Sequence, residues 1–462
     1  MQSVGAPRGA SFRFGVLAIL AGQIASGVVA LLLEACYARL LGPESRGLLS
    51  VCLMSVAFAA LVGAAGGEGS IVFWSSRERG IHGTWLPAVL LWGVLGSSAA
   101  GALWWLAYWK LHLPVLRGVS PYTASLVLLN IPAAILFAYC MALWTGLERF
   151  PQRSIGALSR QLAALAGFLA LLGITGRSPV TALWGAASGY LAASLLTVVL
   201  LWRHLSGFWA VRTAKPNLLP TLAYGLRGQI GNLASFFTYR LDVFVINYFL
   251  PAAQLGYYAL GVTLSEVLWQ FPAAAASVLF PRTARTEGED SARFTCLVMR
   301  QVLLVSSVSG ALLAAVAPFA IPLVFGARFT TSVPVVLALL PGTLALSLAK
   351  VGCSDLAGRG KNGYSSVFAL ACLVFTVAFD LLLIPRWGIL GAAVASSAAY
   401  FLDSLLVLAA LRHELKVAWP ELLLPSADDL ATYRAAWHRL RSVALERTRP
   451  LVAAGPGSAG GE

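Results

Sequence analysis

The chain has 462 residues, of which 58% are hydrophobic and 11% are charged, and its mean hydropathy is +0.78. This composition excludes an ordinary soluble domain and predicts an all-α protein that crosses a membrane many times. The net charge of +14 requires no nucleic-acid partner, because basic loops that contact anionic membrane lipids account for it.

About twelve apolar stretches of the chain reach the roughly 20 residues that a membrane-spanning helix needs. In chain order they cover 14–40, 46–74, 84–109, 120–146, 154–175, 180–202, 220–249, 252–280, 296–325, 331–357, 363–385 and 388–412. Pro132, Pro272 and Pro341 lie inside these stretches. They predict either bent helices around a cavity or kinks that serve packing alone.

Two stretches about 206 residues apart repeat each other with the same landmarks in the same order. Each begins with Gly-Gln-Ile, at Gly22 and at Gly228, runs through an apolar helix that carries charged residues, and turns at Pro43 or Pro251. We therefore predict two six-helix lobes related by internal duplication. Transporters are commonly built from such repeats, with the substrate site between them.

The predicted organisation has four parts. An N-terminal six-helix lobe covers 1–202, a basic inter-lobe linker 203–219, a C-terminal six-helix lobe 220–414, and a tail 415–462. We expect the linker to lie on the cytoplasmic side. The tail combines an amphipathic helix on the membrane surface with a disordered end rich in Gly, Ala and Ser.

The positions of the basic residues predict the orientation of the chain. Twenty-one Lys and Arg residues fall on one side of the predicted topology, and seven, Arg46 among them, fall in the loops of the other side. Because basic loops resist translocation, we expect both termini in the cytoplasm.

Cysteine spacing and loop length exclude several kinds of site. The six cysteines are scattered without paired spacing, so the sequence predicts no disulfide framework, no metal site and no cofactor. Every predicted outer loop is short. A membrane-bound glycan polymerase or ligase would need a large outer loop or a carboxylate-rich catalytic segment, so we expect a protein that is not an enzyme.

Charged residues inside the predicted spans are the functional candidates, because a charge at bilayer depth costs at least about 2.5–3.5 kcal/mol. Each is expected to face the bundle interior, a partner or water. The basic candidates for binding a substrate are Arg227, Arg240 and Lys350, and the acidic candidates for coupling or ion pairing are Glu34, Glu68, Asp242 and Glu266. Asp380 and Asp403 are further acidic residues within spans.

The seventh and eighth spans hold the densest set of charges. Arg240 and Asp242 are two residues apart, so they face different sides of a helix. Glu266 is a candidate protonatable switch or a partner of Arg240; alternatively, the two form a buried ion pair that merely fixes the helices. Arg227 lies about 20 Å along the helix from Arg240 and suits another part of a long substrate.

The remaining candidates are less clustered. Lys350 is an isolated cation that suits an anionic ligand, or else it snorkels to the lipid headgroups. Glu34 and Glu68 are the acidic residues of the first half. Glycines at 66, 67 and 69 predict a helix break beside Glu68.

Several motifs resemble those of Wzx-type polysaccharide flippases. In the first half these are Arg39-Leu-Leu-Gly-Pro-Glu-Ser-Arg-Gly47 and Gly67-Glu-Gly-Ser. In the second half they are Tyr239-Arg-Leu-Asp242 and Leu255-Gly-Tyr-Tyr-Ala-Leu260. The similarity runs over nearly all the predicted spans and leaves out the tail. It rests on the order of the motifs and on the duplication, since no single motif is specific.

The resemblance implies the multidrug/oligosaccharidyl-lipid/polysaccharide exporter superfamily, with two six-helix lobes in a V, a central cavity and alternating access. It implies a lipid-linked oligosaccharide, usually undecaprenyl-diphosphate-linked, moved from the cytoplasmic to the outer leaflet of the bacterial inner membrane for cell-surface polysaccharide. Glycan polymerase and glycosyltransferases are the implied partners. The family shares no strong ligand set, so the roles of the charged residues remain our own inference.

Two other transporters of the same fold remain open. A multidrug exporter would use an acidic or aromatic cavity for cationic drugs, and the deep cations argue against it. A lipid II flippase usually has two more C-terminal spans, where this chain has its tail.

Overall fold

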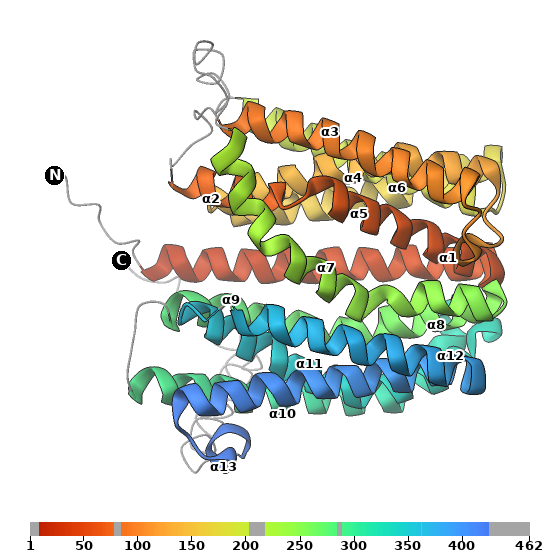
Figure 1. The fold of residues 1–462 in the computed structure, drawn as a ribbon. Helices are drawn as coiled ribbons and strands as arrows, with labels where there is room; N and C mark the ends of the chain where they lie inside the picture. The colour runs from red at the N-terminus through yellow and green to blue at the C-terminus, as the bar shows by residue number, and fades with distance from the viewer. Residues whose placement is uncertain (1–8, 78–84, 203–217, 284–288, 362, 425–462) are drawn as a thin grey trace, which may run out of the picture.

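The computed structural model describes residues 9–77, 85–202, 218–283, 289–361 and 363–424, and the described residues that form regular elements are all helical (Figure 1). Most of the predicted linker and the tail helix beyond residue 424 lie outside these residues. The protein is thus an all-α membrane protein, as the composition predicts.

The described residues of the first half form six α-helices, with a π turn and a 3-10 turn between α3 and α4. They are α1 Gly9–Ala64, α2 Gly67–Arg77, α3 Trp85–Trp105 with the π turn Leu106–Lys110, the 3-10 turn Pro114–Leu116, α4 Pro121–Gly146, α5 Phe150–Thr175 and α6 Pro179–Leu201. Local signals fix some of these boundaries. Ser120 caps α4 by accepting a hydrogen bond from the Thr123 N–H, and Pro121 occupies the first turn.

The second half begins with α7 Leu218–Phe249 and repeats the pattern of long helices. It continues with α8 Ala252–Glu266, the 3-10 turn Val267–Trp269, α9 Gln270–Thr283, α10 Glu289–Ala320, the π turn Ile321–Phe325, the 3-10 turn Ala327–Phe329, α11 Ser332–Gly358, α12 Gly363–Leu415 and the short α13 Trp419–Leu423.

Two of the longest helices are hairpins. The backbone of α1 leaves helical geometry at Gly42, with φ 76°, and that of α12 leaves it at Gly388, with φ 61°. Glycine adopts positive φ without steric cost, so each helix folds back on itself there. In α12 the return arm packs so tightly that a Cβ on Gly391 would lie 2.2 Å from the Leu383 carbonyl oxygen.

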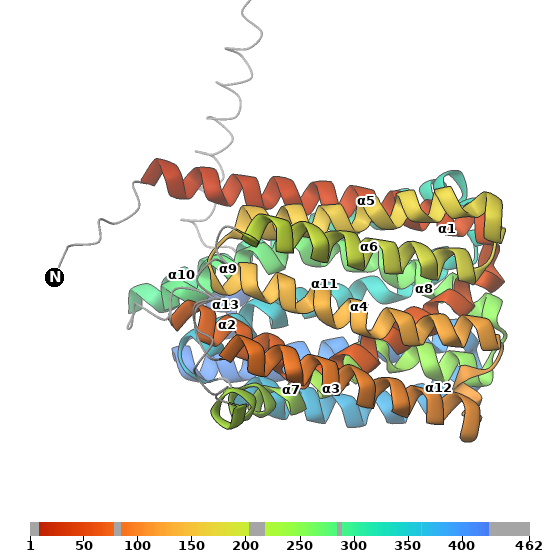
Figure 2. The same cartoon turned by 90° about the horizontal axis from the view of Figure 1, so that it is seen from above.

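Eight helical segments of the described residues are long and apolar enough to cross a membrane. Two of them, Gly22–Ala64 and Gly363–Leu415, contain the hairpin turns. The count of twelve crossings and the internal duplication stay predictions. The described helices lie roughly along one direction (Figures 1 and 2). We call the end where α1 begins and α12 ends the near end, and the opposite end, which holds the turn before α4, the far end.

The two halves lie side by side, and α7 crosses between them (Figure 1). At the far end a Cβ on Gly47 would lie 1.8 Å from the Ala252 carbonyl oxygen, so α1 and α8 touch backbone to backbone. Toward the near end a Cβ on Gly225 would lie 2.3 Å from the Gly66 carbonyl oxygen. The halves therefore contact each other at these two places, which lie toward opposite ends of the bundle.

Candidate functional site

The second half encloses a cluster of charged and aromatic side chains. Arg240 on α7 and Glu266 at the end of α8 form an ion pair, with 2.8 Å between Nη2 and Oε1 and a hydrogen bond of 2.9 Å to Oε2. Their side chains are 27% and 21% exposed, so the pair is partly buried. The contact that the sequence suggested between these two residues is present; their role in transport stays a prediction.

Three aromatic rings lie beside this pair and touch one another. The ring centroids of Tyr239 on α7, Trp269 in the 3-10 turn and Tyr400 on α12 are 5.7–6.0 Å apart. The 3-10 turn between α8 and α9 changes the helical register after Glu266 and carries Trp269. We call Tyr239, Trp269 and Tyr400 the aromatic cluster.

Lys350 on α11 completes the site. Its Nζ lies 4.4 Å from the ring centroid of Trp269 and 5.3 Å from that of Tyr239. Among the described residues it forms no ion pair. The indole N–H of Trp269 is buried, and it too has no hydrogen-bond acceptor among the described residues. A cation stabilised mainly by ring faces, next to a free donor, suits an anionic or hydroxyl-rich ligand.

A pocket of about 260 Å³ opens beside Lys350, between α7, α11 and α12. Asp403 lines it together with the hydroxyl-bearing side chains Ser235, Thr238 and Ser365. Within the described part of the chain, the Asp403 carboxylate has no ion-pair partner. The pocket therefore presents charges of both signs and hydroxyl groups inside an apolar bundle.

Asp242 does not face this pocket. It is 3% exposed, accepts hydrogen bonds from the Tyr258 hydroxyl and from the Val243 N–H at 2.7 Å, and lies 3.4 Å from the Ser396 hydroxyl. Asp242 and Arg240 thus have different partners, which agrees with the prediction that residues two apart face different sides of a helix. Asp380 on α12 is fully buried, and its two carboxylate oxygens have no hydrogen-bond partner among the described residues.

Glu34 has a partner that the sequence did not suggest. Arg46, which we counted among the basic residues of the outer side, is buried: it is 5% exposed and lies 2.8 Å from the Glu34 carboxylate, and it also donates to the Ser50 hydroxyl. The hairpin at Gly42 brings the two arms of α1 together, which turns Arg46 inward. Glu34 is thus held by an ion pair within its own helix.

The other two candidates lie toward the near end. Glu68 is exposed in the first turn of α2, directly after the helix break at Ala65 and Gly66, both of which have positive φ. That break agrees with the prediction from the glycines. Arg227 lies on α7, but its side chain falls outside the described atoms.

Two further pockets lie elsewhere in the bundle. One of about 450 Å³ lies between the halves and is lined almost wholly by apolar side chains. Another of about 190 Å³ lies between α1, α5 and α9 and is lined by Arg153 and by three glutamines, at 23, 161 and 270. Among the described residues, no group of three His, Cys, Asp or Glu side chains is placed to hold a metal ion.

Sequence reasoning missed Arg46, Tyr258 and Tyr400. No local pattern marks Arg46 or Tyr258, because their partners come from packing. Tyr400 does precede Asp403 by three residues, which places both on one helix face, and that spacing was an available signal.

Comparison with known proteins adds a family and a fold. Residues 13–287 match the family described as "Polysaccharide biosynthesis protein". The probable low-salt glycan biosynthesis flippase Agl15 of Haloferax volcanii is 22% identical over 40% of this chain and 40% of that protein. The succinoglycan biosynthesis transport protein ExoT of Rhizobium meliloti is 26% identical over 67% of this chain and 60% of that protein. The matches thus span less than two thirds of these relatives.

Solved structures show the same fold at low identity. The lipid II flippase MurJ in an inward closed conformation superposes with a TM-score of 0.73 at 14% identity, covering 92% of this chain and 93% of that chain. A multidrug resistance MATE family transporter in an inward-facing conformation superposes with a TM-score of 0.63 at 14% identity, covering 84% and 94%. At these identities the likeness concerns the fold.

Proposed function

Because this chain belongs to the polysaccharide biosynthesis protein family, a family of membrane transporters, we propose that it moves a polyprenyl-diphosphate-linked oligosaccharide across the membrane. In this proposal the two lobes open alternately to either side. The lipid-linked glycan passes from the cytoplasmic to the outer leaflet of the bacterial inner membrane, where it supplies cell-surface polysaccharide.

One observation carries the proposal: within an apolar helical bundle, the cation of Lys350 lies over the rings of Tyr239 and Trp269. A second cation, Arg240, follows Tyr239 directly in the chain and is paired with Glu266. A diphosphate crossing a membrane needs cations along its route, and a planar guanidinium binds phosphate oxygens in pairs. Aromatic faces and hydroxyl groups, such as those beside Lys350, are suited to sugar rings.

We assign the charged residues as follows. Arg240 and Lys350 bind the diphosphate, and Glu266 holds Arg240 while the substrate is absent, so substrate and Glu266 compete for one guanidinium. Arg227 contacts another part of the substrate, toward the near end of the bundle. Asp242 and Glu68 remain candidates for coupling, whereas the ion pair with Arg46 supports a structural role for Glu34.

The proposal also gives a role to each part of the chain and names the partner enzymes. The lobes 1–202 and 220–414 move against each other through the linker 203–219, and the tail 415–462 rests on anionic lipids. Glycosyltransferases that build the glycan and a polymerase that consumes it are the partners. Both termini are cytoplasmic.

Each of the two rival functions predicts specific features of the structure. A multidrug exporter needs acidic residues free to bind cations. Glu266 and Glu34 are paired with arginines, whereas Asp403, which lines the pocket beside Lys350, has no ion-pair partner among the described residues. A lipid II flippase is favoured by the MurJ likeness in fold alone. Neither rival explains why Lys350 lies over two rings of the aromatic cluster.

Reconstitution tests the proposal. The purified full-length protein in liposomes should move a fluorescent polyprenyl-diphosphate oligosaccharide between leaflets, measured by the accessibility of the glycan to an impermeant glycosidase. Fluorescent lipid II and a cationic dye serve as competing substrates in parallel liposomes. Movement of lipid II or of the dye, without movement of the oligosaccharide, would refute the proposal in favour of the corresponding rival.

A further inference from the structure

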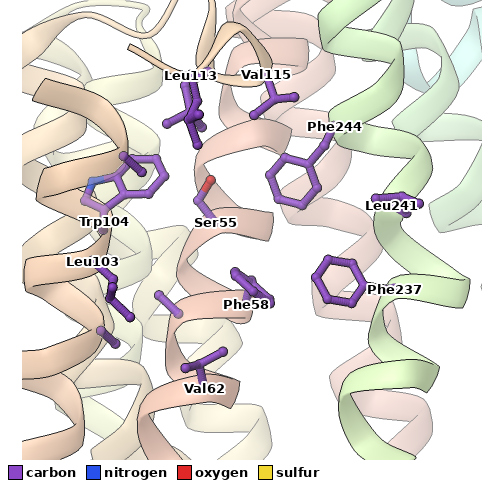
Figure 3. Close-up of a pocket in the computed structure, with 14 residues that line it drawn as sticks. Ser55, Phe58, Val62, Leu103, Trp104, Leu113, Val115, Phe237, Leu241 and Phe244 are labelled. Carbon is purple, nitrogen blue, oxygen red and sulfur yellow. The ribbon is translucent and has the colours of Figure 1, made fainter. Parts of the chain in front are cut away.

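The pocket of about 450 Å³ between the halves has no part in the site described above. It lies toward the far end, and its walls come from the return arm of α1, from α3 with the turn that follows, and from α7 (Figure 3). Figure 3 shows Phe237 and Phe244 on α7 and Phe58 on α1 around one space, with Leu113 and Val115 above it. The rings of Phe58 and Phe237 are 5.1 Å apart.

The chemistry of these walls is almost entirely hydrocarbon. Two lining residues carry a polar side-chain group, Ser55 and Trp104. The Ser55 hydroxyl donates to the Val51 carbonyl at 2.7 Å. The Trp104 indole N–H donates to the Ala124 carbonyl at 3.2 Å, so neither group offers a free donor. The pocket is open on one side. Leu103 and Leu113, which line it, are 57% and 38% exposed. Its volume lies within the range typical of ligand pockets.

Cations flank the turn that covers this pocket. Leu113 to Leu116 form the cover, with Lys110 just before them and Arg117 just after, and both cations are exposed. Among the described residues neither forms an ion pair. Asn247 on α7 donates to the Val115 carbonyl at 2.9 Å and to the Arg117 carbonyl at 3.1 Å, which ties the cover to the second half.

We propose that this pocket binds a segment of the isoprenoid chain of the carrier lipid, with the diphosphate of that lipid at Lys110 and Arg117. The inference rests on the proposed function, because the isoprenoid diphosphate is the anchor of that substrate. In the proposed orientation the far end faces outward, so the pocket would hold the carrier after translocation.

Physical reasoning selects this occupant over a phospholipid. A chain that already lies in the bilayer gains little from entering another apolar space, because lipid tails are as apolar as leucine. Binding must therefore come from close packing and from the headgroup. A methyl-branched chain fits a broad pocket walled by rings, and a diphosphate brings more charge to two cations than a phosphodiester does.

Photo-crosslinking tests the site directly. The full-length protein in phosphatidylcholine nanodiscs is irradiated with geranylgeranyl diphosphate that carries a diazirine on its chain, or with a phosphatidylcholine that carries a diazirine on its acyl chain. Labelled peptides are identified by mass spectrometry. We expect the isoprenoid probe to label the segments around Leu103 and Phe237, and excess phosphatidylcholine not to displace it.

Matched variants locate the binding. Ala100→Phe fills the pocket and should reduce labelling roughly tenfold, whereas Ala99→Phe, on the exposed face of the same helix, should not. Leu103→Trp narrows the open side with less disturbance of packing, and it replaces Ala100→Phe if that variant does not fold. Replacing Lys110 and Arg117 together by Gln should weaken labelling, while Arg177→Gln, an exposed far-end cation elsewhere, should not.

The outcomes separate this inference from the proposed function. Equal labelling by the phospholipid probe, or unchanged labelling in the filled variants, overturns the isoprenoid site even where the liposomes move the oligosaccharide. Pocket labelling that follows the variants upholds the site even where the liposomes move none.

Discussion

Arg240 and Glu266 form an ion pair of 2.8 Å that joins α7 to the end of α8, and Lys350 lies over the rings of Trp269 and Tyr239, on either side of this pair in the chain. The pair connects two consecutive helices, and its side chains remain partly exposed. A ligand therefore has access to it.

We expect Arg240→Ala and Glu266→Gln each to abolish glycan export while the protein still accumulates in the membrane. Removing one partner of a buried pair typically costs about 3–5 kcal/mol of stability, so thermal unfolding is measured alongside transport. Arg240→Lys should restore only part of the activity, because a point charge lacks the bidentate fork. The control is Lys361→Ala, which breaks a pair with Glu414 whose lysine is half exposed, and it should change little. Normal export by both neutral variants would exclude the pair from the working site.

Lys350→Gln should reduce transport in the liposome assay and leave folding nearly intact. A cation over aromatic rings contributes about 0.5–2 kcal/mol, and no carboxylate among the described residues would lose an ion pair. Trp269→Leu removes the closer ring and should weaken transport in the same direction. If Lys350→Gln transports normally, the diphosphate does not use this cation.

Arg46→Ala should destabilise the protein by about 3–5 kcal/mol, because it leaves Glu34 with an unpaired charge at a largely buried position. The double replacement Arg46→Met with Glu34→Leu should recover much of that loss, since apolar residues often replace a buried pair without penalty. Thermal unfolding of the purified variants provides the measurement. A double variant that folds stably but does not transport would show that the pair serves the mechanism.

Two glycine contacts should control the opening of the two ends. Gly47→Ala places a methyl group against the Ala252 carbonyl and should separate the halves at the far end; Gly225→Ala should do so toward the near end, against the Gly66 carbonyl. Gly27→Ala is the control, because no atom lies within 4 Å of its Cβ position.

Pulsed electron paramagnetic resonance measures these openings. Spin labels at Glu44 and Gln254 report the far end, and labels at Ser76 and Leu226 report the near end. Each glycine variant should lengthen the distance at its own end. Unchanged distances in both variants would show that the contacts do not hold the halves together.

The orientation of the bundle is tested by labelling single cysteines on a background without the native ones. Gly118 and Thr330 lie in far-end turns, and Gly360 lies in a near-end turn. Cysteines at the first two positions should react with an impermeant reagent from outside the cell, and a cysteine at Gly360 should not. The basis is the excess of basic residues in the near-end loops. The reverse labelling would invert the proposed topology.

The sequence by itself determined the helical membrane class, because runs of apolar residues long enough to span a bilayer depend only on local composition. It also singled out Arg240, Glu266 and Lys350, since a charge within such a run is costly wherever the chain folds. It suggested the contact between Arg240 and Glu266 because their helices are consecutive.

Only the tertiary structure decided which other side chains meet. The hairpin at Gly42 turned Arg46 toward Glu34, and the packing of α12 against α7 brought Tyr400 to Tyr239, across about 160 residues of chain. Helical periodicity fixes the face of a helix that a residue occupies but not the helix that this face contacts. The pockets follow from the same packing, and for that reason the apolar space between the halves had no signal in the sequence.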